Sequence, residues 1–145
     1  MRTAHVDRSQ EADRRARPRF ATLLVHPEPG ARRIHAHALS RAGYHVAEAA
    51  GGPDALARIR GFRPQVVVID LAPGGIDLCR RIRARADFGN PYVILLLPRE
   101  ELGRLFDVFL AGADDHLVTP APPWALLAKV ARGERVLRAP ERRFP

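Results

Sequence analysis

The sequence predicts an α/β domain in which five parallel strands alternate with five helices. Two apolar runs, at 66–69 and 93–97, are continuous and rich in branched side chains, as in strands that are covered on both faces. Segments with apolar residues at helical spacing separate the runs, and this alternation predicts a parallel sheet with helices on both sides. The 145 residues suffice for one such domain.

In the first half of the chain, glycine closes each expected helix. Apolar residues at helical spacing stop at Gly43, and a brief helix opened by proline ends at Gly61. Between these helices, His45 and Glu48 give one short strand the polar character of a sheet edge. The elements expected here are strands at 21–25, 44–49 and 66–69 and helices at 31–42 and 53–60.

In the second half, Pro98 stops a buried strand, and the clearest apolar stripe of the chain ends at Gly112. The last helix begins near Trp124, which could belong either to the core or to a protein interface. The stripe consists of Leu102, Leu105, Phe106, Phe109 and Leu110. The elements expected here are strands at 93–97 and 116–118 and helices at 76–86, 102–110 and 124–137.

Composition excludes several classes of protein. Cys79 is the single cysteine, so the chain forms no internal disulfide and no cysteine-cluster zinc site. No apolar run approaches the ~20 residues of a membrane span. The first residues lack the apolar core of a secretory signal, and their acidic residues do not suit a transit peptide. We therefore expect a cytoplasmic protein that does not bind membranes.

The net charge of +8 is concentrated at the two ends of the chain. Residues 1–19 hold six arginines against three acidic residues, and residues 132–145 hold five arginines against two. We expect a domain at 20–137 between solvated, disordered basic tails at 1–19 and 138–145. Arginine supplies 23 of the 24 basic residues, which indicates a general compositional bias. Nucleic-acid binding by the tails is therefore a minor alternative.

Parallel sheets of this kind bind ligands beyond the carboxyl ends of their strands. No pair of nucleophile and base is apparent there, so an enzyme is not expected. An imidazole and two carboxylates, from His26, Glu28 and Asp70, could be a transition-metal site, but a polar rim is the favoured interpretation. The residues expected at this edge are His26, Pro27 and Glu28 after the first strand, Asp70 after the third, Leu97 and Pro98 after the fourth, and Thr119 after the fifth.

Three segments resemble the receiver domain of bacterial two-component response regulators. They are RAGYHV at 41–46, RPQVVVIDL at 63–71 and AGADDHL at 111–117. The resemblance extends from residue 21 to about residue 137. It implies a flavodoxin-like, three-layer (βα)5 fold with strand order 2-1-3-4-5. It also implies a role in two-component or phosphorelay signalling, with a histidine kinase or an output protein as partner.

The resemblance further implies five functional positions at the carboxyl edge. A phosphoryl group bound there needs an aspartate acceptor, an acidic pair holding Mg²⁺, a hydroxyl group and a lysine. Asp70 matches the acceptor. The acidic pair falls on His26 and Pro27 and the lysine on Thr119. The hydroxyl falls on Leu97, or on Leu96 if the register slips by one residue.

The chain is thus similar to a degenerate receiver, in which weak or absent Mg²⁺ binding is expected. Glu28 follows the missing acidic pair, and its direction is open. The favoured function is signalling by protein contact, including a possible homodimer through the last two helices and the fifth strand. Two alternatives remain: phosphorylation of Asp70, and a small-molecule or nucleotide site at the carboxyl edge of the sheet.

Two more positions follow from the resemblance. His116 stands where receivers carry an aromatic side chain that moves together with the hydroxyl residue. Because Leu97 replaces that hydroxyl, we expect His116 to be fixed and partly buried. A cis peptide bond is also implied before Pro120.

Overall fold

A computed structural model describes residues 19–71 and 73–140. Most of the expected basic tails lie outside these residues. The first strand begins at Arg19 and the last helix ends at Arg138, one residue beyond the expected domain at each end. Within the described ranges, no helix has both the length and the apolar character needed to cross a bilayer.

Five parallel strands form one sheet in the order β2-β1-β3-β4-β5, which confirms the predicted fold class. The register pairs Val25 of β1 with Ile69 of β3, and Asp70 of β3 with Leu96 of β4. The strand with polar positions lies at the sheet edge, as expected. The strands are β1 (Arg19–Val25), β2 (Tyr44–Ala49), β3 (Val66–Asp70), β4 (Tyr92–Pro98) and β5 (Asp115–Thr119).

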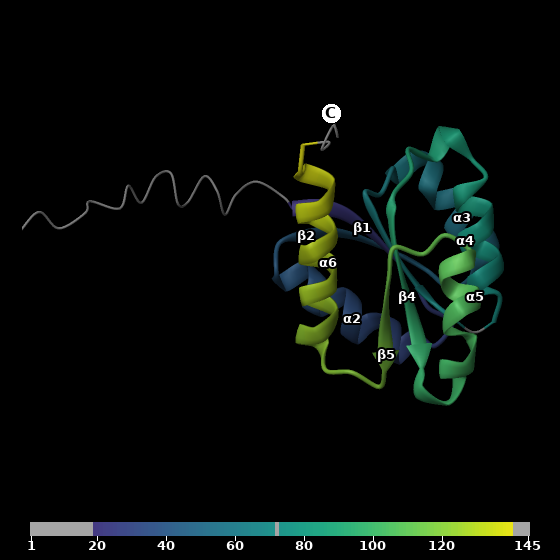
Figure 1. The fold of residues 1–145 in the computed structure, drawn as a ribbon. Helices are drawn as coiled ribbons and strands as arrows, with labels where there is room; N and C mark the ends of the chain where they lie inside the picture. Colours follow the sequence, from purple (N-terminus) through teal and green to yellow (C-terminus); the bar gives the residue numbers. More distant parts are fainter. Residues whose placement is uncertain (1–18, 72, 141–145) are drawn as a thin grey trace, which may run out of the picture.

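Helices cover both faces of the sheet (Figure 1). The helices α2 and α6 pack on one face, and α3, α4 and α5 pack on the other. The five helices are α2 (Pro29–Arg41), α3 (Gly52–Phe62), α4 (Gly75–Arg83), α5 (Leu105–Leu110) and α6 (Pro123–Arg138), and two short 3-10 segments are η1 (Ala86–Phe88) and η2 (Arg99–Arg104).

The core divides into two apolar layers because side chains alternate across the pleated strands. In β4, Leu95 and Leu97 contribute to the layer beneath α3, α4 and α5, whereas Ile94 and Leu96 contribute to the layer beneath α2 and α6. All four side chains are fully buried. Burial of each such side chain contributes about 1.5–3 kcal/mol, so this strand is a main source of stability.

Two expected helices differ from the structure. The helix expected at 76–86 ends at Arg83 and is followed by η1. The helix expected at 102–110 is interrupted, because Glu101 has a non-helical backbone and residues 99–104 form η2. The regular helix α5 is consequently short, and Val108 is its buried residue.

The apolar stripe expected on the helix at 102–110 lies largely at the surface. Phe106 is 73% exposed and Leu110 is 67% exposed, whereas Leu105 is partly buried. Trp124 at the start of α6 is 69% exposed, so it lies at the surface and not in the core. These large apolar side chains are therefore available to a partner.

Arg83 joins the end of α4 to two neighbouring loops. Its Nε donates to the Gly112 carbonyl at 2.7 Å, and its Nη1 donates to Asn90 Oδ1 at 2.8 Å and to the Pro91 carbonyl at 2.6 Å. Its Nη2 contacts Asp114, whose Oδ2 also accepts from the Val93 N–H. A Cβ at position 112 would lie 2.7 Å from Arg83 Cγ, and the backbone there has φ +100°. Glycine is therefore required at this turn.

We expect Arg83→Met to lower the free energy of unfolding by about 2 kcal/mol, because four hydrogen bonds, two of them part-buried, are lost together. Arg80→Met is the matched control: this side chain is exposed on the same helix, and its replacement should change stability by less than ~0.5 kcal/mol. Urea denaturation followed by circular dichroism measures both. Equal stability of the two variants would contradict the role assigned to Arg83.

Candidate functional site

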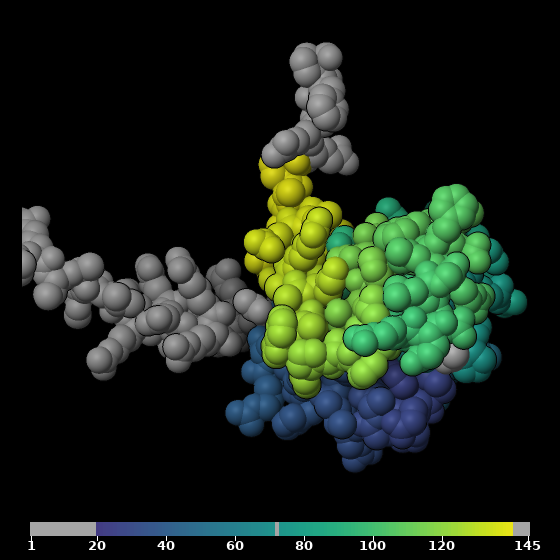
Figure 2. All heavy atoms as spheres, turned by 60° about the horizontal axis from the view of Figure 1, so that its bottom comes forward, coloured from purple at the N-terminus to yellow at the C-terminus, as the bar shows by residue number. Residues whose placement is uncertain are grey.

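Asp70 ends β3 at the carboxyl edge of the sheet, between β1 and β4. Figure 2 turns this edge toward the reader and shows that early, middle and late parts of the chain adjoin there. His26 follows β1, and its Nε2 lies 3.5 Å from Asp70 Oδ1. The two side chains are only 14% and 13% exposed. The expected strand-end residues His26 and Asp70 are thus brought together in a partly dehydrated position.

The backbone fixes the orientation of the His26 ring. The Glu28 N–H donates to His26 Nδ1 at 3.1 Å. Because an accepting nitrogen carries no proton, the proton of the neutral ring is on Nε2, which faces Asp70. Arg32 Nη1 also donates to the His26 carbonyl at 2.8 Å. His26 therefore presents an N–H group to the Asp70 carboxylate from a restrained loop, at a separation longer than an ordinary hydrogen bond.

The direction of Glu28, which the sequence left open, is toward the start of α2. Its carboxylate accepts from the Gly30 N–H at 2.9 Å and from the Ala31 N–H. These backbone hydrogen bonds, with the Ala31 bond the stronger contributor, lower the pKa of the Glu28 carboxyl. Glu28 is therefore the ionised N-cap of α2.

The remaining two family positions supply no charge to Asp70. Leu97 is fully buried in the core layer beneath α3, α4 and α5. Thr119 ends β5 and lines a separate hollow of about 390 Å³, together with His26, His35 and Pro120. Lys129, the single lysine, pairs with Asp115 at 3.0 Å, at the start of β5. Its ammonium group thus lies at the other edge of the sheet.

These residues do not fit a magnesium ion. Mg²⁺ requires octahedral oxygen coordination, usually from one or more carboxylates with water. Pro27 offers no side-chain oxygen, and the Glu28 carboxylate is occupied by α2. The transition-metal alternative from His26, Glu28 and Asp70 meets the same obstacle at Glu28, whose carboxylate caps α2. Across residues 19–71 and 73–140, no three His, Cys, Asp or Glu side chains are placed to hold a metal ion.

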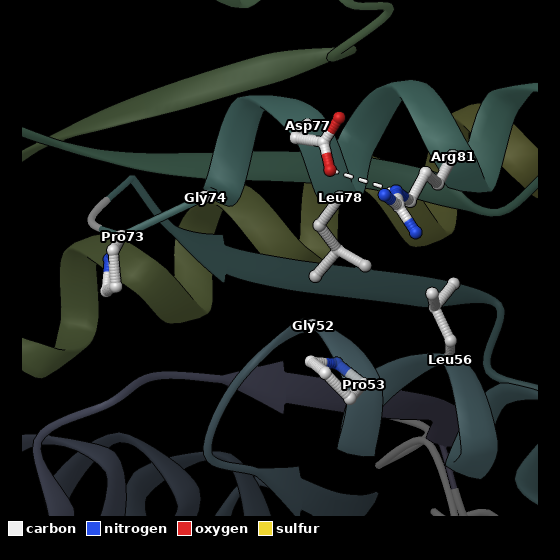
Figure 3. A pocket seen from close by; sticks show the side chains of 8 residues that line it. All are labelled: Gly52, Pro53, Leu56, Pro73, Gly74, Asp77, Leu78 and Arg81. Atoms are coloured by element: carbon white, nitrogen blue, oxygen red, sulfur yellow. Dashed lines mark hydrogen bonds and ion pairs between the residues drawn. The ribbon is translucent and has the colours of Figure 1, made fainter.

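Two adjoining hollows beside Asp70 were not expected from the sequence. The first, of about 270 Å³, is lined by Pro27, Asp70 and Gly75 among others. The second, of about 410 Å³, lies between α3 and α4, where Leu56 and Leu78 point into it and the Asp77–Arg81 ion pair lies on its rim (Figure 3). The residues common to both are Gly52, Pro53, Pro73, Gly74 and Leu78. Asp70 therefore opens onto a largely apolar cleft.

The cleft depends on a close approach of α4 to the end of β3. A Cβ at position 75 would lie 2.3 Å from the Asp70 carbonyl oxygen, so Gly75 allows contact that any other residue would prevent. Gly74, with φ +77°, turns the chain into α4. The pair Gly74–Gly75 is thus a tight strand-to-helix turn.

His116 and Pro120 complete the site. The His116 ring packs edge-on against the Phe109 ring, with 5.7 Å between centroids and 88° between planes. This contact connects β5 to the exposed surface of α5. The peptide bond between Thr119 and Pro120 is cis.

Cys79 does not contribute thiol chemistry. It is fully buried on the inner face of α4, and burial raises the pKa of the thiol to about 11. Its Sγ donates to the Ala111 carbonyl at 3.4 Å. The thiol is therefore protonated and inaccessible at neutral pH.

Comparison with known proteins gives one consistent result. The model of the response regulator receiver domain matches residues 22–131. The chain is 37% identical over 120 residues to the transcriptional regulatory protein AfsQ1 of Streptomyces coelicolor, covering 78% of this chain and 52% of that protein. It is 36% identical over 114 residues to the DNA-binding response regulator MtrA of Mycolicibacterium smegmatis, covering 74% and 47%. The chain thus spans about half the length of these relatives.

Solved structures give the same fold. The chemotaxis response regulator CheY4 of Vibrio cholerae superposes with a TM-score of 0.72 at 25% identity, covering 79% of this chain and 98% of that one. A putative response regulator from Chloroflexus aurantiacus superposes with a TM-score of 0.75 at 29% identity, covering 82% and 99%.

We expect Gly75→Ala to lower the free energy of unfolding by about 2 kcal/mol, because the added methyl group forces α4 away from the Asp70 carbonyl. Gly61→Ala is the control: its Cβ would meet open space, and alanine should stabilise the helix by a few tenths of a kcal/mol or more. Urea midpoints measure both changes. If Gly75→Ala were as stable as Gly61→Ala, the close approach would be wrong.

Proposed function

The chain belongs to the response regulator receiver family, whose members act in two-component signalling, and on that basis we propose that it is a degenerate receiver. In this proposal it signals through protein contact and not through Mg²⁺-dependent phosphorylation of Asp70. The contact of His26 Nε2 with Asp70 Oδ1 is the observation that carries the proposal. An imidazole stands where the resemblance implies a metal-binding carboxylate.

Electrostatics favours the unphosphorylated state of Asp70. A phosphoryl group adds about −1.5 to −2 charges at neutral pH, and receivers offset this charge with a metal ion and a lysine. Here Thr119 stands at the lysine position and Pro27 at a metal-ligand position. A single imidazole compensates one carboxylate better than it compensates a phosphorylated one, so the phosphorylated state is disfavoured.

The surface proposed for protein contact lies on η2 and α5, beside β5. Its exposed apolar side chains form a single band, here named the α5 band. A buried leucine, Leu97 or Leu96, stands where the resemblance implies a switching hydroxyl, and His116 packs against Phe109. The α5 band is thereby held in one arrangement, which favours constitutive binding of a second copy or an output protein. The band consists of Leu102, Phe106, Phe109 and Leu110.

A second candidate is a phosphorylatable receiver. The position of Asp70 favours it, because the carboxylate ends the central strand β3 and lines a hollow of about 270 Å³. A small phosphodonor could reach the carboxylate from this side. The two candidates differ in whether the chain accepts a phosphoryl group.

Metal binding and phosphorylation distinguish the candidates. We expect calorimetry to detect no saturable Mg²⁺ site at millimolar concentrations, and intact mass spectrometry to detect no phosphoryl adduct after incubation with a small phosphodonor. The variant His26→Asp, Pro27→Asp, Thr119→Lys should regain both properties, because it restores oxygen ligands and a cation. Adding Asp70→Asn to that variant should abolish the adduct. A Mg²⁺-dependent adduct on the natural chain that Asp70→Asn removes would establish the second candidate.

The α5 band should determine self-association. We expect Leu110→Ser to weaken a homodimer about tenfold or more in sedimentation velocity, because an exposed leucine in a contact surface contributes more than about 1 kcal/mol. Ile34→Ser is the matched control, since Ile34 is similarly exposed, at 60%, on α2. Asp70→Asn should leave the dimer unchanged. Equal weakening by Leu110→Ser and Ile34→Ser, or a chain that is monomeric at every concentration, would contradict self-association through this band.

A further inference from the structure

Exposed arginines without ion pairs gather at the amino edge of the sheet, opposite Asp70. Helices in a parallel α/β sheet end at this edge, so the last turns of α2, α3 and α6 meet there. In Figure 1 this is the upper end of the molecule, where α6 ends. All five side chains are exposed, and none forms an ion pair with another described residue. We name this set the arginine pole; it consists of Arg41, Arg60, Arg63, Arg132 and Arg135.

No described acidic residue forms an ion pair with the arginine pole, although the charge of Arg60 acts on Asp87. The acidic residues at this edge are each engaged with another basic side chain: Asp87 with Arg85, Asp114 with Arg83, Asp115 with Lys129 and Glu134 with Arg138. Most other acidic residues lie near the carboxyl ends of strands or the starts of helices, and therefore toward the opposite edge. These include Glu28, Glu48, Asp54, Asp70, Asp77 and Glu100.

Helix dipoles explain only part of this arrangement. A helix C-terminus carries about half a negative charge and favours one basic side chain. The last two turns of α6 alone hold Arg132, Arg135 and Arg138. The unpaired positive charge therefore exceeds what the helix ends offset. In the folded chain these arginines lie at one edge of the sheet, which the composition alone did not reveal.

A hollow of about 360 Å³ lies at the same edge of the sheet, and Arg63 of the arginine pole lines it. Its lining includes Arg63, Phe20 and Phe88. The Arg138 guanidinium lies 4.8 Å from the centre of the Phe20 ring, and the Arg85 guanidinium lies 4.8 Å from the centre of the Phe88 ring. Aromatic side chains thus hold two further guanidinium groups at the border of the hollow. Guanidinium groups around such a hollow suit the phosphate oxygens of a nucleic-acid backbone.

We propose that the arginine pole binds the phosphate backbone of nucleic acid without sequence specificity. Arginine suits this role because its planar guanidinium forms paired hydrogen bonds with phosphate oxygens. The arginine pole lies at the opposite edge of the sheet from Asp70 and shares no residue with the α5 band, so this inference does not depend on the proposed function.

Fluorescence anisotropy with the full chain tests the proposal. We expect it to bind short fluorescein-labelled duplexes of two unrelated sequences with similar affinity, and the binding constant should fall steeply with salt. The variant Arg60→Gln, Arg63→Gln, Arg135→Gln should bind at least about tenfold more weakly at low salt. It should also reduce the slope of log K against log salt by about 2.7, because three phosphate contacts are lost.

The matched control removes the same charge from the opposite edge. Arg33, Arg99 and Arg104 are exposed and form no ion pair with another described residue. The variant Arg33→Gln, Arg99→Gln, Arg104→Gln should therefore retain most of the binding, as should Asp70→Asn. Equal weakening by both triple variants, or no salt-dependent binding, would overturn the proposal. Tighter binding to phosphatidylserine vesicles than to the duplex, lost in the arginine-pole variant, would also overturn it in favour of a membrane surface.

Discussion

Burial of β3 and β4 on both faces confines the polar chemistry of this chain to the two edges of its sheet. The central side chains of these strands are apolar and fully buried, and an unpaired polar group among them would cost several kcal/mol. Charged groups therefore appear where strands end. Asp70 is the last residue of β3 at one edge, and the arginine pole lies on helix ends at the other.

The substitutions at the carboxyl edge form a consistent set. Two further carboxylates beside Asp70 would repel it unless a cation were bound. His26 replaces one of these positions with a group that attracts Asp70, and Pro27 removes the other. Glu28 remains, but its charge stabilises the first turn of α2. In the proposed degenerate receiver, His26 therefore takes the place of a metal ion beside Asp70.

The sequence predicts much of the fold because periodicity and glycine positions act locally. Continuous apolar runs identify β3 and β4, while the strand order rests on the family resemblance. The break at Glu101 and the exposure of Phe106 were not predicted, because they depend on how η2 and α5 meet the sheet. The Arg83 contacts were also missed, although Asp114 belongs to a recognised segment, since nothing local connects residues 83 and 114.

The candidate site was predictable as a set of residues but not as a geometry. Strand ends placed His26 near Asp70, yet the ring orientation depends on the Glu28 N–H, a backbone group that no side-chain pattern reveals.

The geometry of the site also limits how the proposed module is controlled. A ligand shifts a two-state equilibrium only through different affinities for the two states. If Leu97 and His116 keep the loops around them in a single conformation, phosphorylation of Asp70 has no second conformation to stabilise. Partner binding at the α5 band then responds to the concentrations of the chain and its partner, as mass action requires.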